Sequence, residues 1–329
     1  MSDTLIKNWQ ETESKSLRDA FGEATLELGK EYRDIVVLTA DLTSSTKVEE
    51  FKQKFPQRFF QVGVAEQNLV GIGAGLAMTR KIPFCCSFAS FLTGRAWEQI
   101  RNCLAINNLA VKLVGSHAGL SHPSDGVTAQ GTEDIAIMRS LPNMAVVYPA
   151  DFNQMLEAVK AVYQYPAPVY LRMTREPTPV FIKKKASFEF GRAQILKEGK
   201  DVTVIGAGPL LYEALLAIKK AKNKGTDCEL INLHTIKPID KQTIINSVRK
   251  TGCLVTVEDH QVQAGVGSAI AEVVVKNYPV PVEMIGLDNE FGRTARSYQT
   301  LLREYNLTSF FILQAIKKAL LRKNGVKKN

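Results

Sequence analysis

The feature that most constrains the fold is a regular alternation of short apolar runs with longer segments of helical periodicity. Residues 16–32 place Leu17, Phe21, Ala24 and Leu28 on one helical face. Strands are expected at the apolar runs 35–39, 59–64, 83–88, 111–115, 145–148, 169–173, 201–205, 228–232 and 253–258. Such alternation predicts an α/β fold, in which mostly parallel sheets are covered by helices on both faces.

The pattern is interrupted once, between residues 176 and 186. Pro177, Pro179 and the lysines at 183–185 break the alternation there. A length of 329 residues also suits two domains of about 150 residues each. We therefore predict a first domain over residues 1–185 and a second over residues 186–329.

Composition excludes several classes of protein. With 45% hydrophobic residues the chain can bury large cores, and its longest uncharged apolar stretch, 69–78, is about half of a membrane span. The first ten residues lack the apolar core of a signal peptide, so we expect a cytoplasmic protein. Five cysteines without C-x-x-C spacing fit reduced core thiols.

The net charge of +9 raises the question of nucleic-acid binding. Much of the excess lies in the lysine-rich runs 183–185, 219–224 and 317–328. These runs lack interleaved aromatic residues, which favours a solvated surface over a nucleic-acid groove. We therefore expect neither a nucleic-acid partner nor a membrane partner.

Two motifs resemble ligand-binding sites, but each lacks residues that such a site needs. The segment 202–208 resembles the start of a dinucleotide fingerprint, but its third glycine is replaced by Leu211, so it predicts only a turn between strand and helix. Asp125-Gly126 followed by Asn153 imitates a magnesium–diphosphate motif. A hard cation needs several converging oxygens, so we expect no metal site in this chain.

Side chains able to do chemistry stand where strands are expected to end. Glu66 lies between an expected strand and helix, and is either a first-turn helix acid or a buried carboxyl that can share a proton. His117 directly follows the run 111–115, where open α/β sheets bind ligands, and His122 stands five residues later. For these histidines a solvated loop and a ligand site both remain open.

Several longer strings, taken together, carry a family resemblance. They are GVAEQN at 63–68, SFASFLTGRAWEQIR at 87–101, HAGLSHPSDG at 117–126, EDIAIMRSLPNM at 133–144 and VEDHQVQAGVGSAIAE at 257–272. In this order, and over nearly the whole chain, they resemble the C-terminal half of transketolase. The family's diphosphate-binding domain normally precedes this half. The resemblance therefore implies the second subunit of a split transketolase, with a pyrimidine-binding domain and a C-terminal domain.

The resemblance implies roles for the cofactor-facing residues. Glu66 matches the glutamate that hydrogen-bonds N1′ of the thiamine diphosphate aminopyrimidine, and it is the expected catalytic residue together with His117. Phe88 and Phe91 fall on the aromatic positions where one ring stacks on the pyrimidine, and Asp41 matches an acid lining the cofactor cleft. The accompanying Mg²⁺ or Ca²⁺ is expected on the partner subunit.

It also implies a substrate site and an activity. The family binds the sugar-phosphate end at positions matched here by Arg18, Ser45, His117 and Arg175, although Arg172 could exchange roles with Arg175. Asp125 matches the acid that contacts the donor's hydroxyls. The implied reaction moves a two-carbon unit from a ketose to an aldose. It requires an N-terminal, diphosphate-binding partner subunit in an α2β2 assembly.

Other interpretations compete with a transketolase subunit. The beta subunit of a 2-oxo acid dehydrogenase has a similar length and the same glutamate, but is not expected to keep the phosphate-binding set. Half of a deoxyxylulose-phosphate synthase shares a string like LPNM at 141–144. A scaffold or nucleic-acid binder that kept the fold would not need Glu66 and two arginines.

The chain also departs from the family pattern. His122-Pro123-Ser124 replaces the usual residues before Asp125, Ala129 replaces a substrate-contacting His or Gln, and Arg293-Thr294 follows the late Phe-Gly pair. The first two changes fall in the family's substrate channel. A modified sugar is therefore an alternative to the usual sugar phosphates as the substrate.

Overall fold

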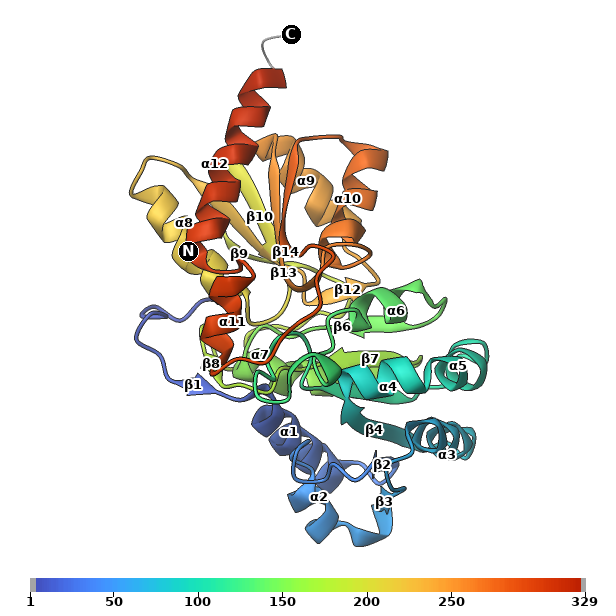
Figure 1. Cartoon of the computed structure of the whole chain (residues 1–329). Coiled ribbons are helices and arrows are strands. Elements are labelled where there is room, and N and C mark those ends of the chain that lie inside the picture. The colour runs from blue at the N-terminus through green and yellow to red at the C-terminus, as the bar shows by residue number, and fades with distance from the viewer. Residues whose placement is uncertain (1–3, 327–329) are drawn as a thin grey trace.

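The computed structural model describes residues 4–326, so Lys327 and Lys328 of the expected basic run lie outside the described residues. Its strands form two large sheets and a small ribbon in which β1 (Ser14–Lys15) pairs with β8 (Thr178–Pro179). Helices cover both faces of each large sheet (Figure 1). The predicted fold class, α/β with mostly parallel sheets between helices, is confirmed.

The first large sheet has the strand order β12-β6-β7-β5-β4-β2-β3. Its neighbouring strands are parallel, except that β12 runs antiparallel to β6. These strands are β2 (Ile35–Thr39), β3 (Phe59–Gln61), β4 (Ile82–Phe88), β5 (Lys112–Ser116), β6 (Ala145–Val147), β7 (Val169–Arg172) and β12 (Thr235–Lys237). Because side chains alternate along a strand, Ile35 and Val37 face one helical layer and Val36 and Leu38 the other.

Two layers of helices cover the two faces of this sheet. The layer against Ile35 contains α1 (Leu17–Glu31), α2 (Glu49–Lys54) and α7 (Phe152–Gln164). The opposite layer contains α3 (Glu66–Met78), α4 (Ala89–Arg95), α5 (Trp97–Gln99), a π-helical turn (Ile100–Ala105) and α6 (Asp134–Ser140). Ser16 begins α1 by accepting a hydrogen bond from the backbone N–H of Arg18 at 3.2 Å. This cap holds Arg18 at the start of its helix.

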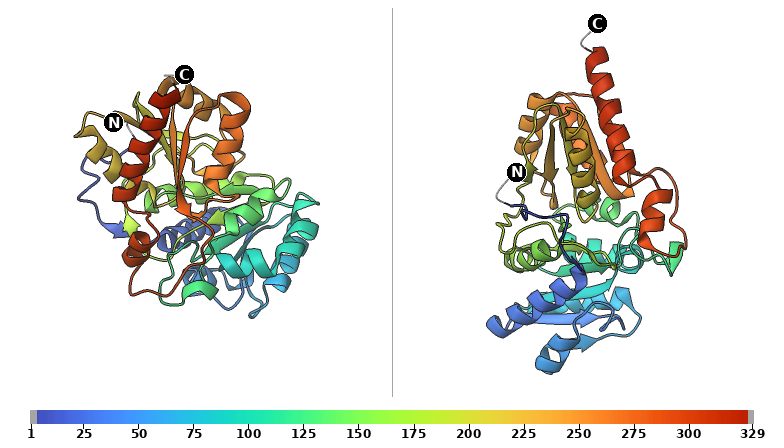
Figure 2. Two further views of the ribbon diagram at one scale, coloured as in Figure 1. Left: turned by 45° about the horizontal axis from the view of Figure 1, so that its top comes forward. Right: turned by 90° about the vertical axis from the view of Figure 1, so that its left-hand side faces the viewer.

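The second large sheet has the order β14-β13-β10-β11-β9, with only β9 antiparallel. Its strands are β9 (Gln194–Lys197), β10 (Val202–Gly206), β11 (Cys228–Asn232), β13 (Leu254–Gln261) and β14 (Val282–Leu287). One face packs on α9 (Lys241–Thr251) and α10 (Val266–Asn277), and the other on α8 (Leu211–Lys222) and α12 (Ser309–Val326). Figure 2 shows α12 extending beyond this sheet, whereas α11 (Tyr298–Glu304) lies beside the first unit.

The two units are joined across the predicted boundary at residue 185. Strand β12 comes from the second half of the chain but extends the first sheet through its pairing with β6. One hydrophobic core also runs without a break from Val36 in β2 to Val274 in α10. The domain boundary at residue 185 stays a prediction. Because the two units share a strand pairing and a core, this boundary does not imply that residues 186–329 fold separately.

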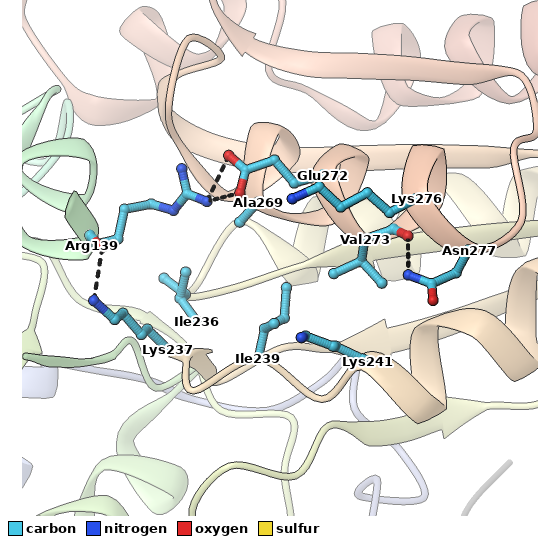
Figure 3. Close-up of a pocket in the computed structure, with 10 residues that line it drawn as sticks. All are labelled: Arg139, Ile236, Lys237, Ile239, Lys241, Ala269, Glu272, Val273, Lys276 and Asn277. Carbon is cyan, nitrogen blue, oxygen red and sulfur yellow. Dashed lines mark hydrogen bonds and ion pairs between the residues drawn. The ribbon is translucent and has the colours of Figure 1, made fainter. Parts of the chain in front are cut away.

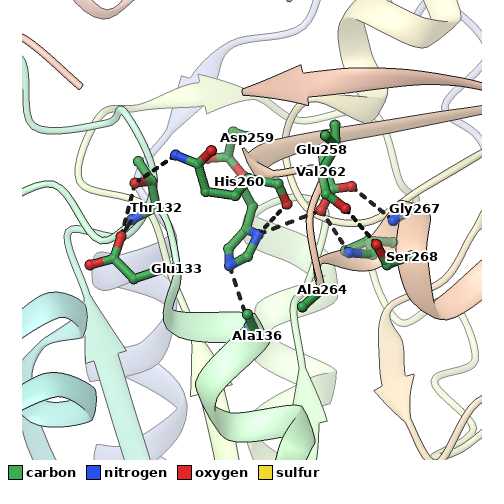
Figure 4. Close-up of polar contacts among 12 residues, drawn as sticks. Thr132, Glu133, Ala136, Glu258, Asp259, His260, Val262, Ala264, Gly267 and Ser268 are labelled. Atoms are coloured by element: carbon green, nitrogen blue, oxygen red, sulfur yellow. Dashed lines mark hydrogen bonds and ion pairs between the residues drawn. The ribbon is translucent and has the colours of Figure 1, made fainter. Parts of the chain in front are cut away.

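A buried ionic cluster lies between the units. Arg172, at the end of β7, is fully buried and donates hydrogen bonds to Asp134 in α6 (2.8 Å) and Asp259 in β13 (2.7 Å). The ring of Tyr148 lies 4.4 Å from the guanidinium, and its hydroxyl donates to Asp259. Next to this cluster Glu258 accepts hydrogen bonds from the first turn of α10 (Figure 4), and burial raises its pKa to about 8.

Two expectations from composition can be compared with the structure. Among residues 4–326 no helix is long and apolar enough to cross a membrane. All five cysteines are free thiols, and only Cys103 is not buried. Burial raises the pKa of Cys85 to about 12, which keeps this thiol protonated and unreactive.

Candidate active site

The expected site residues gather at the carboxyl ends of the parallel strands of the first sheet. Asp41 follows β2, Phe88 ends β4, His117 directly follows β5, and Arg175 stands three residues after the end of β7. In a sheet of this kind ligands bind at the carboxyl edge. The structure therefore places these four residues along the same edge of the sheet.

Glu66 is the first residue of α3, and its side chain is only 2% exposed. Its carboxylate accepts a hydrogen bond from Ser87 Oγ at 3.0 Å and pairs with Arg95 Nη1 at 3.2 Å. Glu66 therefore lies in the first turn of α3, as one interpretation predicts, and its carboxyl is also buried, as the other predicts. Its ability to share a proton stays a prediction. Ser87 and Arg95 were missed from the sequence, although Arg95 stands one helical turn after Phe91 in α4.

Aromatic rings connect this carboxyl to the histidines. Phe88 and Phe91 are stacked with their centroids 5.6 Å apart, and the guanidinium of Arg95 lies 4.2 Å from the Phe91 centroid. Phe88 also stacks on His117 at 3.9 Å and meets His122 edge-on at 5.6 Å. Through Arg95, the glutamate therefore joins the two phenylalanines and the two histidines in one continuous wall.

His117 is buried and has a backbone φ of 60°, a conformation that side chains other than glycine rarely adopt. Its Nδ1 lies 2.7 Å from Ser116 Oγ. Burial, reinforced by the nearby charge of Arg18 and by His122 and Arg175, lowers the pKa of His117 to about 2. The interpretation as a solvated loop histidine is wrong, because the side chain is buried, and its low pKa favours the neutral imidazole.

His122 is buried beside it, with ring centroids 4.7 Å apart. Its Nε2 lies 3.2 Å from the Asp125 carboxylate, and its Nδ1 has no hydrogen-bond partner among the described residues. Burial lowers the pKa of His122, and the cations Arg175 and Arg18 add to this effect, whereas Asp125 opposes it. Asp125 itself is half exposed.

The arginines separate into two roles. Arg18 donates from Nη1 to the backbone carbonyl of Ser45 at 2.9 Å. Burial lowers the pKa of Arg18, and the positive charge of Arg175 lowers it further. Arg175 is partly exposed and pairs with Glu176. Arg172 is enclosed in the ionic cluster between the units, so the proposed exchange of roles with Arg175 is wrong.

Asp41 lies at the edge of this group. It is exposed, has a backbone φ of 61°, and accepts a hydrogen bond at its Oδ1 from Gln61 Nε2 at 3.4 Å. In the described part of the chain no contact joins Asp41 to the other expected site residues. Its cofactor-lining role stays a prediction.

Two segments that depart from the family pattern, residues 122–124 and 293–294, lie next to each other in the structure. Gln130 donates from Nε2 to the carbonyls of His122 (3.3 Å) and Arg293 (3.1 Å), and Ala295 N–H donates to the Pro123 carbonyl at 3.0 Å. A Cβ at Gly292 would meet Gln130 Oε1, so a larger residue at this position would have to displace the Gln130 amide. The segment of the second unit before α11 thus supports the loop at 122–130.

Other features lie outside this site. A hollow of about 310 Å³ between α6, β12 and α10 has an apolar floor and a basic rim, with Arg139 paired to Glu272 (Figure 3). Its lining includes none of the expected site residues. Within residues 4–326 no three His, Cys, Asp or Glu side chains are grouped to hold a metal ion. Asn153, of the discounted motif, donates to the Ile182 carbonyl at 2.8 Å.

The structure has a first α/β unit that carries the candidate site and a smaller second α/β unit, and comparison with known proteins shows which family this arrangement belongs to. Residues 13–180 match the family model "Transketolase, pyrimidine binding domain", and residues 191–310 match "Transketolase, C-terminal domain". The chain belongs to the transketolase family.

Similar proteins specify the kind of transketolase. A Methanocaldococcus jannaschii protein named as a transketolase C-terminal section is 43% identical over 92% of this chain and 95% of its own length. The 6-deoxy-6-sulfo-D-fructose transketolase subunit of a Clostridium species is 38% identical over 94% of this chain and 95% of its own length. A solved "Split gene transketolase, inactive beta4 tetramer" superposes with a TM-score of 0.87, at 43% identity over 94% of this chain and 99% of its own. The chain is therefore a transketolase-type beta subunit, and the 2-oxo acid dehydrogenase alternative is not favoured.

Proposed function

We propose that this chain supplies the pyrimidine-binding half of a thiamine diphosphate-dependent transketolase, which transfers a two-carbon unit from a ketose phosphate to an aldose phosphate. The observation that carries the proposal is the enclosed carboxyl of Glu66. In the same site Phe88 stacks on Phe91 and on His117, and the charges of Arg18 and Arg175 act on that imidazole. A buried carboxylate near flat apolar rings suits an aminopyrimidine, and two guanidiniums suit a phosphate dianion.

The residues present fit the cofactor's pyrimidine end. Phe88 and Phe91 would contact the ring, and Glu66 would hold a proton at its N1′, while Ser87 and Arg95 keep the carboxylate in place. When bound, thiamine diphosphate supplies the carbon nucleophile and electron sink that such a transfer needs. Asp41 is proposed to line the same cleft.

The remaining residues are proposed to bind and orient the sugar. Arg18, Ser45, His117 and Arg175 would receive the phosphate end. The neutral imidazole of His117 can accept a hydrogen bond from a sugar hydroxyl or donate one to it, because its ring carries no charge. Asp125 would accept hydrogen bonds from the donor's hydroxyls. Phe88 and both histidines are buried, which limits the access of water to their side chains.

A partner subunit is proposed to complete the site. The face of α3 next to Glu66 exposes Gln67, Gly71 and Gly75, and Met78 at its end is 76% exposed, as is typical of a surface covered by another chain. We propose that this partner is an N-terminal transketolase subunit. It would hold the diphosphate through Mg²⁺ or Ca²⁺ in an α2β2 assembly. The cytoplasmic location stays a prediction.

The isolated chain is expected to have no ketol-transfer activity and to bind thiamine diphosphate tightly only with that partner. Isothermal titration of thiamine diphosphate and magnesium into the chain, with and without a candidate N-terminal subunit, measures this. Ketol transfer by the purified single chain would contradict the proposal. Tight binding to the single chain would show that it holds a complete diphosphate site.

Replacing Arg18 by alanine is expected to raise the KM for a phosphorylated acceptor by about tenfold or more and to leave that for an unphosphorylated one nearly unchanged. The physical reason is the loss of one charge-assisted contact to the phosphate. Steady-state kinetics of the assembled enzyme with both acceptors is the measurement. Arg33→Ala, at an exposed position two residues after the end of α1, is the matched control. An equal effect of Arg18→Ala on both acceptors would exclude the phosphate role.

A further inference from the structure

We propose that His122 is a further substrate-binding residue, which takes up a proton and contacts the phosphate of a phosphorylated sugar when the sugar binds. This inference rests on the proposed function and adds to it a residue and a preference for dianionic substrates. His122 stands where the chain departs from the family pattern, so the matched family positions do not account for it.

The environment of the ring leaves one atom available for a ligand. The side chain is 5% exposed, its faces and edges meet His117 and Phe88, and its Nε2 is held by Asp125 at 3.2 Å. The Nδ1 atom is buried without a partner in the described part of the chain. An unpaired buried polar atom destabilises the folded protein, so a ligand that pairs with it gains affinity.

Two further buried polar atoms lack partners in the described part of the chain, Arg18 Nε and Oγ1 of Thr174, the residue that precedes Arg175. The charges of both arginines act on His122. Buried donors without partners in and next to two cationic residues suit a polar, negatively charged ligand.

The charges facing His122 explain why its protonation should depend on the ligand. Arg18 and Arg175 disfavour the imidazolium, Asp125 and Glu176 favour it, and burial keeps the pKa low. A phosphate dianion between the arginines would offset their repulsion. His122 would then take one proton from solvent onto its ring, donating from Nε2 to Asp125 and from Nδ1 to a phosphate oxygen.

His117 does not compete for this proton. Its Nδ1 already faces Ser116 Oγ, no carboxylate contacts it in the described structure, and its pKa is lowered to about 2. Asp125 contacts only the second histidine of the pair. The two adjacent imidazoles therefore differ in protonation state when the anion is bound, with His117 neutral and His122 charged.

The proposal predicts which anionic group the channel prefers. An imidazolium stabilises a dianion more than a monoanion, because the attraction scales with charge. A relative 38% identical to this chain acts, by its name, on 6-deoxy-6-sulfo-D-fructose, whose sulfonate is a monoanion. We propose that the present chain takes a phosphate in preference to a sulfonate.

The test uses the full chain with ¹³C-labelled histidine, because it contains only four histidines. Imidazole resonances are titrated against pH alone, with inorganic phosphate, and with methanesulfonate. His122→Asn and His122→Gln each identify the resonance by its loss. Phosphate is expected to raise the proton affinity of His122 about tenfold, methanesulfonate much less, and neither should protonate His117.

Phosphate affinity provides the second readout. Because the proton is taken up on binding, affinity in the parent chain should gain a component that strengthens as pH falls, and His122→Asn should lose it. Asp125→Asn should weaken the same component. Binding of phosphate that depends on Arg18 but leaves the His122 resonance unmoved would overturn this inference alone. No Arg18-dependent binding of phosphate at all would overturn the proposed phosphate channel as well. An equal effect of methanesulfonate would overturn the preference for dianions.

Discussion

Replacement of Glu66 by glutamine is expected to reduce turnover of the assembled enzyme by about 10²-fold or more, the scale of a lost proton-transfer partner. Glutamine keeps the size of the side chain and can still accept from Ser87, but it cannot hold and return a proton. The enclosed position of Glu66 allows no water to take over this role easily. Steady-state turnover with the partner subunit is the measurement.

The matched control for this substitution is Glu98→Gln, the same chemical change on an exposed side chain of nearby α5. It should leave turnover unchanged. Thermal unfolding should be similar for both variants, because neither removes apolar burial. If Glu66→Gln turned over within a few-fold of the parent enzyme, Glu66 would have no part in the proton transfer.

Replacement of Arg172 by methionine is expected to lower the free energy of unfolding by about 3–5 kcal/mol, the usual cost of removing one partner from a buried ion pair. The change leaves the carboxylates of Asp134 and Asp259 buried without their cation. Denaturant unfolding at one fixed protein concentration measures the loss. Arg192→Met is the control, since its pair with Glu189 is exposed and contributes about 0–1 kcal/mol.

The loss should depend on pH in a defined direction. Burial already raises the pKa of Asp259, and Arg172 opposes that shift. Without the arginine the folded-state pKa rises further above the unfolded value, so the folded variant binds protons more tightly than the unfolded chain. Its stability therefore falls as pH rises through that pKa, and the deficit should be smaller at pH 5 than at pH 8. A deficit independent of pH would contradict this account of the cluster.

Local pattern predicted most of the secondary structure. Helix α1 and strand β2 lie within a residue of their expected bounds at 16–32 and 35–39, because a capped amphipathic helix and a buried apolar run are specified by neighbouring residues. Strand β12 was not predicted. The segment Thr235–Lys237 is short and has no strand pattern of its own. It forms a strand because it pairs with β6, about 90 residues earlier in the chain.

The site was predicted unevenly, for a similar reason. Residues in recognisable strings, such as Glu66 and Phe88, could be named from the sequence. Arg95 and Ser87 were missed, because their contact with Glu66 joins the end of one helix and the end of one strand to the start of another helix. The exchange between Arg172 and Arg175 could not be decided from spacing, since both stand near the same strand end.

The sequence by itself determined the fold class, the family and the residues proposed to face the cofactor and the sugar, because these depend on periodicity and on short strings of neighbours. Only the tertiary structure decided which groups are buried together. It enclosed His117 and His122, assigned Arg172 to the cluster between the units, and set the segment around Gly292 against the loop at 122–130. Protonation and charge pairing depend on desolvation and on distances across the fold, and spacing along the chain does not contain them.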